Sequence, residues 1–160
     1  MRSEALKRFC ILVAGLAAAA TAAAAGPLEV ATAVLVEKGV AAADGTTHTR
    51  LVAPERVVPG DRIVVELRYR NTGPQPLGGV VIANPVPAGL AFRAVEAGTP
   101  EPEVSVDGTT FARLSALTVR TAQGASRPAA PGDVRAVRWR IGAPVAPGVA
   151  GRLAFRAVVK

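Results

Sequence analysis

Apolar and polar residues alternate along several stretches of the chain, which is the pattern of β-strands with one buried face. The clearest stretch covers 62–70. One parity of this stretch holds Ile63, Val65, Leu67 and Tyr69, and the other holds Arg62, Glu66, Arg68 and Arg70. Similar patterns predict further strands over 28–36, 77–86, 90–95, 134–141 and 152–159.

Turn-forming residues separate these stretches. Pro-Gly-Asp occurs at 59–61 and 131–133, and Asp107-Gly108 lies between two short runs that predict a hairpin. We expect a strand over 111–119 and a polar loop over 123–131. Seven or eight short strands, each with one apolar face, bury those faces by closing against a second sheet. The sequence therefore predicts an all-β fold, an antiparallel β-sandwich.

The first 25 residues have a different pattern. A basic start with Arg2, Lys7 and Arg8 is followed by an apolar run and by an alanine tract that ends at Ala25. This order is typical of a secretory signal peptide cleaved before Gly26. A transmembrane anchor is the alternative, but it needs about 20 strongly apolar residues. We predict a signal peptide over 1–25, one domain over 26–160, no stable membrane span, and a periplasmic, cell-surface or secreted location.

The amino-acid composition limits the kinds of reactive or metal-binding site that the chain can form. The 160 residues carry 19 Lys+Arg and 12 Asp+Glu, and a chain cleaved after residue 25 would keep 16 basic residues, 14 of them Arg. The one cysteine, Cys10, would leave with the signal peptide, so thiol chemistry is not expected. One His and one Cys exclude a metal site built from several thiolates or imidazoles of one chain.

Two longer segments resemble a known family. Pro59-Gly60-Asp61 before an alternating strand, then Asn71-Thr72-Gly73, then Pro85-Val86-Pro87-Ala88-Gly89-Leu90, resembles the bacterial conserved repeat domain, which is domain of unknown function eleven. The segments PGDVRAVRW (131–139) and APGVAGRLAFRAVV (146–159) look like that family's closing hairpin. The resemblance covers about 58–92 and 131–159. It implies an immunoglobulin-like sandwich in exported envelope or surface proteins, without a defined activity.

Residues able to carry catalysis or metal binding are sparse. His48 is expected in a loop after Asp44, and Ser105, Ser115 and Ser126, which could serve as nucleophiles, all lie outside a Gly-x-Ser-x-Gly motif. The aspartates do not form the clustered run of a calcium loop. We expect Asp61 and Asp133 to accept hydrogen bonds from turn amides. The sequence predicts no catalytic, cofactor or metal residues.

Arginine is the most distinctive feature. Arg138, Arg140, Arg152 and Arg156 are expected to point away from the face that carries Trp139 and Phe155. If 134–141 and 152–159 pair, these four guanidinium groups share one sheet surface that could bind carboxylates or phosphates. The alternative is a solvated outer face. Nucleic acid is not expected, because export removes the usual targets and Trp139 is assigned to the core.

These observations predict an exported, non-enzymatic envelope or surface module. It would be structural, or would bind an envelope protein or an anionic polymer through the basic sheet face, as a monomer or weak oligomer. The alternative is a pilus-type chaperone or subunit that exchanges an edge strand, for which the apolar stretch 28–36 is suited. A hydrolase or calcium-dependent enzyme would require His48 or the turn aspartates to converge in a pocket.

Overall fold

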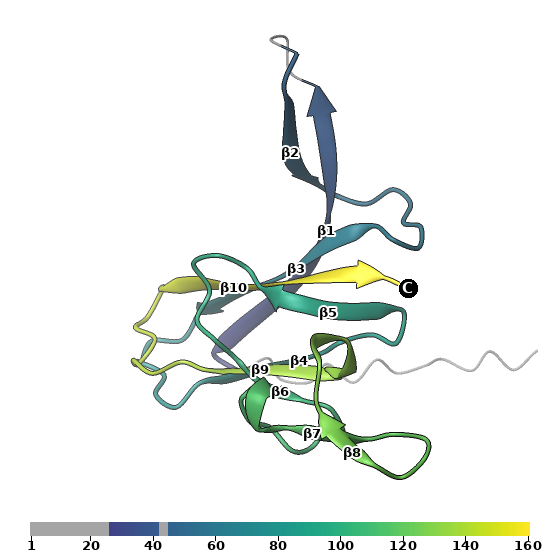
Figure 1. Ribbon diagram of the computed structural model, residues 1–160. Helices are drawn as coiled ribbons and strands as arrows, with labels where there is room; N and C mark the ends of the chain where they lie inside the picture. Colours follow the sequence, from purple (N-terminus) through teal and green to yellow (C-terminus); the bar gives the residue numbers. More distant parts are fainter. Residues whose placement is uncertain (1–25, 42–44) are drawn as a thin grey trace, which may run out of the picture.

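The computed structural model describes residues 26–41 and 45–160 (Figure 1). The expected signal peptide, residues 1–25, lies outside the described residues, as does Asp44. The described strands are β1 (Leu28–Ala41), β2 (Thr47–Val52), β3 (Arg62–Asn71), β4 (Val81–Pro85), β5 (Leu90–Val95), β6 (Glu103–Ser105), β7 (Thr118–Arg120), β8 (Ser126–Pro128), β9 (Ala136–Arg140) and β10 (Ala150–Val159). Two short 3-10 helices complete the elements, η1 (Leu114–Ala116) and η2 (Pro131–Asp133).

Two antiparallel sheets make up the body of the molecule. One has five strands in the order β2-β1-β3-β10-β5, and the other has three in the order β4-β9-β6. Strands β7 and β8 form a separate pair, seen in Figure 1 at the far end from β2. This arrangement confirms the prediction of an all-β antiparallel sandwich.

The core lies between the two sheets. Trp139 of β9 is 1% exposed and Phe155 of β10 is 0% exposed, and their ring centroids are 6.5 Å apart. Phe92 of β5 packs on Phe155 with a centroid separation of 5.8 Å. The indole Nε1 of Trp139 donates to the carbonyl oxygen of Pro100 at 2.8 Å, so its one polar atom is satisfied. The inward position expected for Trp139 is confirmed.

Most expected strands are present, but three segments fold differently from the prediction. The stretch 77–86 is a strand only over β4, and Leu77 forms an isolated bridge to Val145. The stretch 111–119 forms η1 and then β7, because Leu114 and Leu117 follow the three-residue spacing of a 3-10 turn and break the alternation. The expected loop 123–131 includes β8. The hairpin at Asp107-Gly108 is supported by two backbone hydrogen bonds between Val104 and Ala112.

The expected closing hairpin is wrong. Strand β9 pairs with β4 and β6, whereas β10 pairs with β3 and β5, so the connection 141–149 crosses between the sheets. Buried Asn71 at the end of β3 holds this connection in place. Its Nδ2 donates to the carbonyl oxygens of Val145 and Gln75, each at 2.8 Å, and its Oδ1 accepts the amide of Gly73.

Strand β1 belongs to two parts of the molecule. Residues 28–36 pair with β3 inside the sandwich, and residues 36–41 pair with β2. Figure 1 shows the β1–β2 hairpin extending beyond the other strands of the five-stranded sheet, and we call it the arm (residues 37–41 and 45–52). Val36 is buried at its base, but most arm residues are exposed. His48 lies in β2 and not in the expected loop, because β2 continues the ladder with β1.

Candidate functional site

The four arginines expected on one surface are divided between two. The inward side chains of Trp139 and Phe155 meet across the core. The outward side chains of β9 and β10 therefore point to solvent on opposite sides of the molecule. Arg138 and Arg140 therefore lie on the three-stranded sheet, and Arg152 and Arg156 on the five-stranded sheet. The shared surface predicted from the sequence is wrong, because it required β9 and β10 to pair.

Arg138 and Arg140 converge on a single carboxylate. Glu103 Oε2 accepts hydrogen bonds from Arg138 Nε at 2.9 Å and Nη2 at 2.6 Å, and from Arg140 Nε at 3.2 Å. The Arg138 guanidinium also lies 4.2 Å from the ring centroid of Phe111. The hydrogen bond from Arg138 lowers the pKa of Glu103 below its ordinary value. Both arginines are therefore engaged within the protein.

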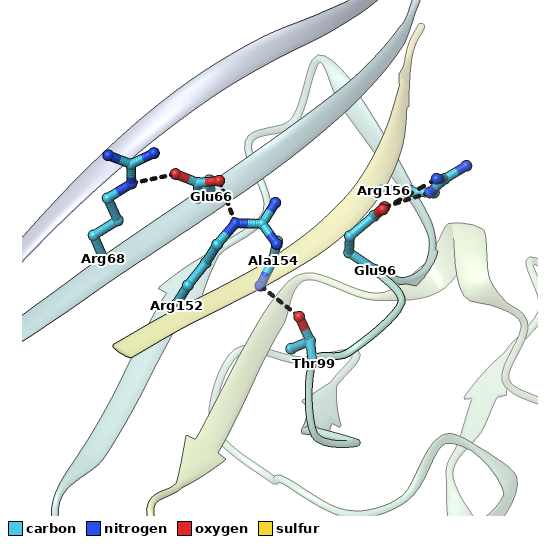
Figure 2. A network of polar contacts seen from close by, with 7 residues as sticks. All are labelled: Glu66, Arg68, Glu96, Thr99, Arg152, Ala154 and Arg156. Carbon is cyan, nitrogen blue, oxygen red and sulfur yellow. Dashed lines mark hydrogen bonds and ion pairs between the residues drawn. The ribbon is translucent and has the colours of Figure 1, made fainter. Parts of the chain in front are cut away.

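We call the side of the five-stranded sheet that turns away from the three-stranded sheet the outer face. At its centre is Glu66 of β3, which is 4% exposed (Figure 2). Its two carboxylate oxygens accept hydrogen bonds from Arg152 Nε and from Arg68 Nε, the latter at 2.5 Å. The Arg152 hydrogen bond lowers the pKa of Glu66 although burial opposes this shift.

Arg156 is held by two further carboxylates of the outer face. Its Nε and Nη2 donate to Glu96 at 2.5 and 3.1 Å, and its Nη1 lies 3.2 Å from Glu37 (Figure 2 shows the Glu96 contact). The Arg156 hydrogen bond lowers the pKa of Glu96. Next to Arg156, the loop after β5 satisfies the backbone of β10 in place of a neighbouring strand. Thr99 Oγ1 accepts a hydrogen bond from the amide of Ala154, and the amide of Glu96 donates to the carbonyl oxygen of Ala154.

Other arginines of the outer face have no such partner. Arg62 and Arg70 of β3 share the parity of Glu66, and Arg93 lies on β5. All three are exposed, and among the described residues none forms an ion pair within 4.0 Å. Glu37, Glu66 and Glu96 are engaged in ion pairs, which leaves Glu29 as the remaining described acid of this face. The outer face thus keeps a surplus of unpaired positive charge.

A hollow of about 410 Å³ opens on the outer face near the base of the arm. The residues that line it come from β1, β3, β5 and β10: Glu37, Arg62, Ile63, Arg93, Arg156, Ala157 and Val158. The sequence analysis did not select Arg62 or Arg93. The alternation over 62–70 placed Arg62 outward, but only the pairing of β3 with β10 brings it near Arg156.

Arg93 lines this hollow beside an irregularity in strand pairing. Arg156 pairs with Ala94, but the next residue, Ala157, pairs with Phe92, so Arg93 is the extra residue of a β-bulge. Leu90 and Phe92 pack on the core, so simple alternation already leaves Arg93 on the outer side, and the bulge returns Val95 to the core side. Alternation over 90–93 thus indicates the outward direction of Arg93, whereas its nearness to Arg156 follows only from the pairing of β5 with β10.

The other candidate residues do not converge. His48 is exposed on the arm, with Nε2 3.1 Å from Thr46 Oγ1. Asp61 Oδ2 accepts the amide of Val58 at 2.9 Å, and Asp133 Oδ2 accepts that of Ala130 at 2.8 Å, which confirms both turn predictions. The hydrogen bond from Arg127 lowers the pKa of Asp133 to about 2. Within 26–41 and 45–160 there is no group of three or more His, Cys, Asp or Glu able to hold a metal ion.

In that same part of the chain, no helix has the length and apolar character to cross a membrane. Searches of protein-family models, curated proteins and solved structures find no match to this chain. The resemblance to the conserved repeat domain therefore stays a prediction.

Proposed function

We propose that this chain is an exported, non-enzymatic envelope or surface module that holds an anionic envelope polymer against its outer face. The observation that carries this proposal is the charge balance of that face. Arg62, Arg70 and Arg93 lack an ion pair among the described residues, whereas three of the four described glutamates of the face are engaged. The pattern of residues 1–25 supports export.

Arginine suits this task better than lysine. A guanidinium group is planar, stays charged, and presents parallel N–H donors that match carboxylates and phosphates. Here Glu66 holds Arg68 and Arg152 in place, and Glu96 holds Arg156. The unpaired arginines Arg62, Arg70 and Arg93 lie on the same face as these fixed ion pairs, so an anionic chain along the face could contact more than one unpaired guanidinium group.

The test reverses the unpaired charges and leaves the ion pairs intact. The triple variant Arg62→Glu, Arg70→Glu and Arg93→Glu is compared with wild type for retention on isolated envelope fractions, at low and high ionic strength. We expect strong loss of retention in the variant and a weaker wild-type interaction at high salt. Reversal of Arg152 or Arg156 would be a poor test, because it would place like charges beside Glu66 or Glu96.

A matched control has the same change in net charge. Arg113→Glu, Arg120→Glu and Arg135→Glu alter exposed arginines of the segment between β6 and β9, outside the strands that form the outer face. Equal loss in both triple variants would show that net charge alone governs retention, which contradicts a role for the outer face. If protease treatment of the envelope fraction abolishes wild-type retention, the partner is an acidic protein and the polymer proposal fails.

A second candidate function is edge-strand exchange through β1. Over 28–35, β1 pairs only with β3 among the described residues, so the backbone groups on its other side have no strand partner. Val30 and Val34 belong to the inward parity of β1 yet are 46% and 40% exposed. A strand from a second copy could pair with this edge and cover both valines.

This candidate makes a separate prediction about assembly. Strand exchange between copies would give a dimer whose population rises with protein concentration in sedimentation equilibrium, and Val34→Lys would abolish it. Val81→Lys is the matched control, because Val81 is 46% exposed on the other sheet. A wild-type chain that stays monomeric at all concentrations would exclude self-exchange and leave binding at the outer face as the proposal.

A further inference from the structure

The hollow on the outer face is lined by positive charge that the protein itself neutralises only in part. Three arginines line it, Arg62, Arg93 and Arg156, together with one acid, Glu37. Guanidinium groups gathered around one concave site repel one another, and a bound anion relieves that repulsion. The hollow is therefore the part of the outer face where an anionic group would gain most.

The three arginines differ in their availability. Arg156 uses Nε and Nη2 on Glu96 and directs Nη1 to Glu37, so it is largely occupied and fixed in place. Arg62 and Arg93 form no ion pair among the described residues. The hollow thus offers two available guanidinium groups beside an ordered ion-pair cluster.

The backbone places these two arginines around the same opening. Arg62 starts β3 opposite Val158 of β10, and Arg93 is the extra residue of the bulge between β5 and β10. Val158 and Ala157, which also line the hollow, lie on β10 between the two arginine-bearing strands. A ligand above this part of β10 would have one guanidinium on each side.

We propose that the hollow binds a phosphomonoester group, held between Arg62 and Arg93. This proposal rests on the proposed function, because the group would belong to the anionic polymer. A phosphomonoester carries about two negative charges and three acceptor oxygens near neutral pH, which matches two unpaired guanidinium groups. A single carboxylate carries one charge and two oxygens, so it would leave part of this donor set unused.

The test measures ligand binding directly by calorimetry on protein purified after expression of the full chain. The probes are glycerol phosphate, inorganic phosphate and acetate. We expect glycerol phosphate to bind and acetate to bind at least about tenfold more weakly, because acetate has fewer charged contacts. Binding of inorganic phosphate without glycerol phosphate would mean a site for the free ion, and equal binding of acetate would mean a nonspecific basic patch. Either result would overturn the proposal.

Three single variants locate the site. Arg62→Ala and Arg93→Ala should each weaken glycerol phosphate binding about tenfold or more. Arg70→Ala is the matched control, because Arg70 is unpaired and lies on the same strand and face as Arg62 but outside the hollow. Thermal unfolding of each variant confirms that it is folded. An equal loss in Arg70→Ala would contradict a site in the hollow.

Failure of this inference can be separated from failure of the proposed function. If the triple reversal of the outer face abolishes envelope retention but glycerol phosphate does not bind, the phosphomonoester site is wrong and the polymer-binding face stands. If neither envelope fractions nor glycerol phosphate bind the wild-type protein, both proposals are wrong. If glycerol phosphate binds and Arg62→Ala also weakens envelope retention, both are supported.

Discussion

The outer surfaces of the two sheets carry similar arginine patterns in different surroundings. On β9, Arg138 and Arg140 share Glu103, whose side chain is 36% exposed. On β10, Arg152 pairs with Glu66, whose side chain is 5% exposed and also receives Arg68. The same residue type therefore pairs with a partly exposed carboxylate on the three-stranded sheet and with a buried carboxylate on the five-stranded sheet.

This difference follows from sheet width. Glu66 lies on β3, which has β1 on one side and β10 on the other, so neighbouring strands shield its carboxylate from solvent. Glu103 lies on the three-residue strand β6 at the edge of a three-stranded sheet, where the neighbour on the other side is the single bridge from Val104 to Ala112 and not a further strand of the sheet. A charged group that is buried without a partner destabilises the folded protein far more than an exposed charged group does. The ion pairs of Glu66 should therefore matter more to stability than those of Glu103.

The largest effect is expected from Arg152→Ala. The substitution removes one of the two partners of a buried carboxylate, and we expect a loss of about 2–3 kcal/mol in the free energy of unfolding. Urea unfolding followed by the fluorescence of buried Trp139 measures this loss. Combining the variant with Glu66→Gln should recover part of it, because the uncompensated charge is then removed. A loss no greater than that of Arg70→Ala would contradict a structural role for this pair.

At acidic pH, the difference in stability to unfolding between wild type and Arg152→Ala should become smaller. The folded-state pKa of Glu66 lies below its ordinary value of 4.5, so ionisation of this group contributes stability above about pH 4.5. That contribution is lost as the pH falls through the lowered folded-state pKa. Without Arg152, the same carboxyl gains less from being ionised. We expect the unfolding midpoints of the two proteins to converge as the pH falls below about 4.5, and parallel curves would contradict this linkage.

A smaller effect is expected from Arg138→Ala on the opposite surface. Glu103 remains partly exposed and keeps Arg140 as a partner, so water can compensate for the lost contact. Part of the remaining loss should come from the contact with the Phe111 ring. Urea unfolding at low and high salt separates the two contributions, because salt screens the ion pair and leaves the ring contact largely intact. A loss as large as that of Arg152→Ala would remove the distinction between the two surfaces.

The smallest effect on stability is expected from Arg62→Ala. Its side chain is exposed and has no ion pair among the described residues, so the free energy of unfolding should change by less than about 0.5 kcal/mol. The same variant should show the large loss of ligand binding described above. If Arg62→Ala instead destabilises the protein strongly, Arg62 has a structural contact, and the comparison between fixed and available arginines would need revision.

The four arginines predicted to share one surface show what a local sequence pattern can and cannot predict. Alternation correctly assigned Arg138, Arg140, Arg152 and Arg156 to the outward sides of their strands, because side chains of a strand point to its two faces in turn. It could not assign those strands to sheets. Pairing depends on contacts between distant segments, such as the bond from Asn71 to the connection after β9.

The positions of the available arginines depend more strongly on the tertiary structure. Arg62 appeared in the clearest strand of the chain, but its neighbours across β10 follow from the register of strands about 90 residues apart. Arg93 faces outward by alternation with Leu90 and Phe92, but its position beside Arg156 follows only from the pairing of β5 with β10. Strand β2 was not expected, because its residues are mostly exposed and do not need an alternating apolar face.

By itself, the sequence determined that the chain forms strands with one apolar face, where several of them begin and end, and that it carries far more arginine than lysine. Those properties follow from local alternation, turn residues and composition. Only the tertiary structure decided which strands share a sheet, which arginines are consumed by Glu66, Glu96 and Glu103, and which two remain around the hollow. The physical reason is that the charge available at a surface depends on neighbours in space, and a strand's own sequence does not specify those neighbours.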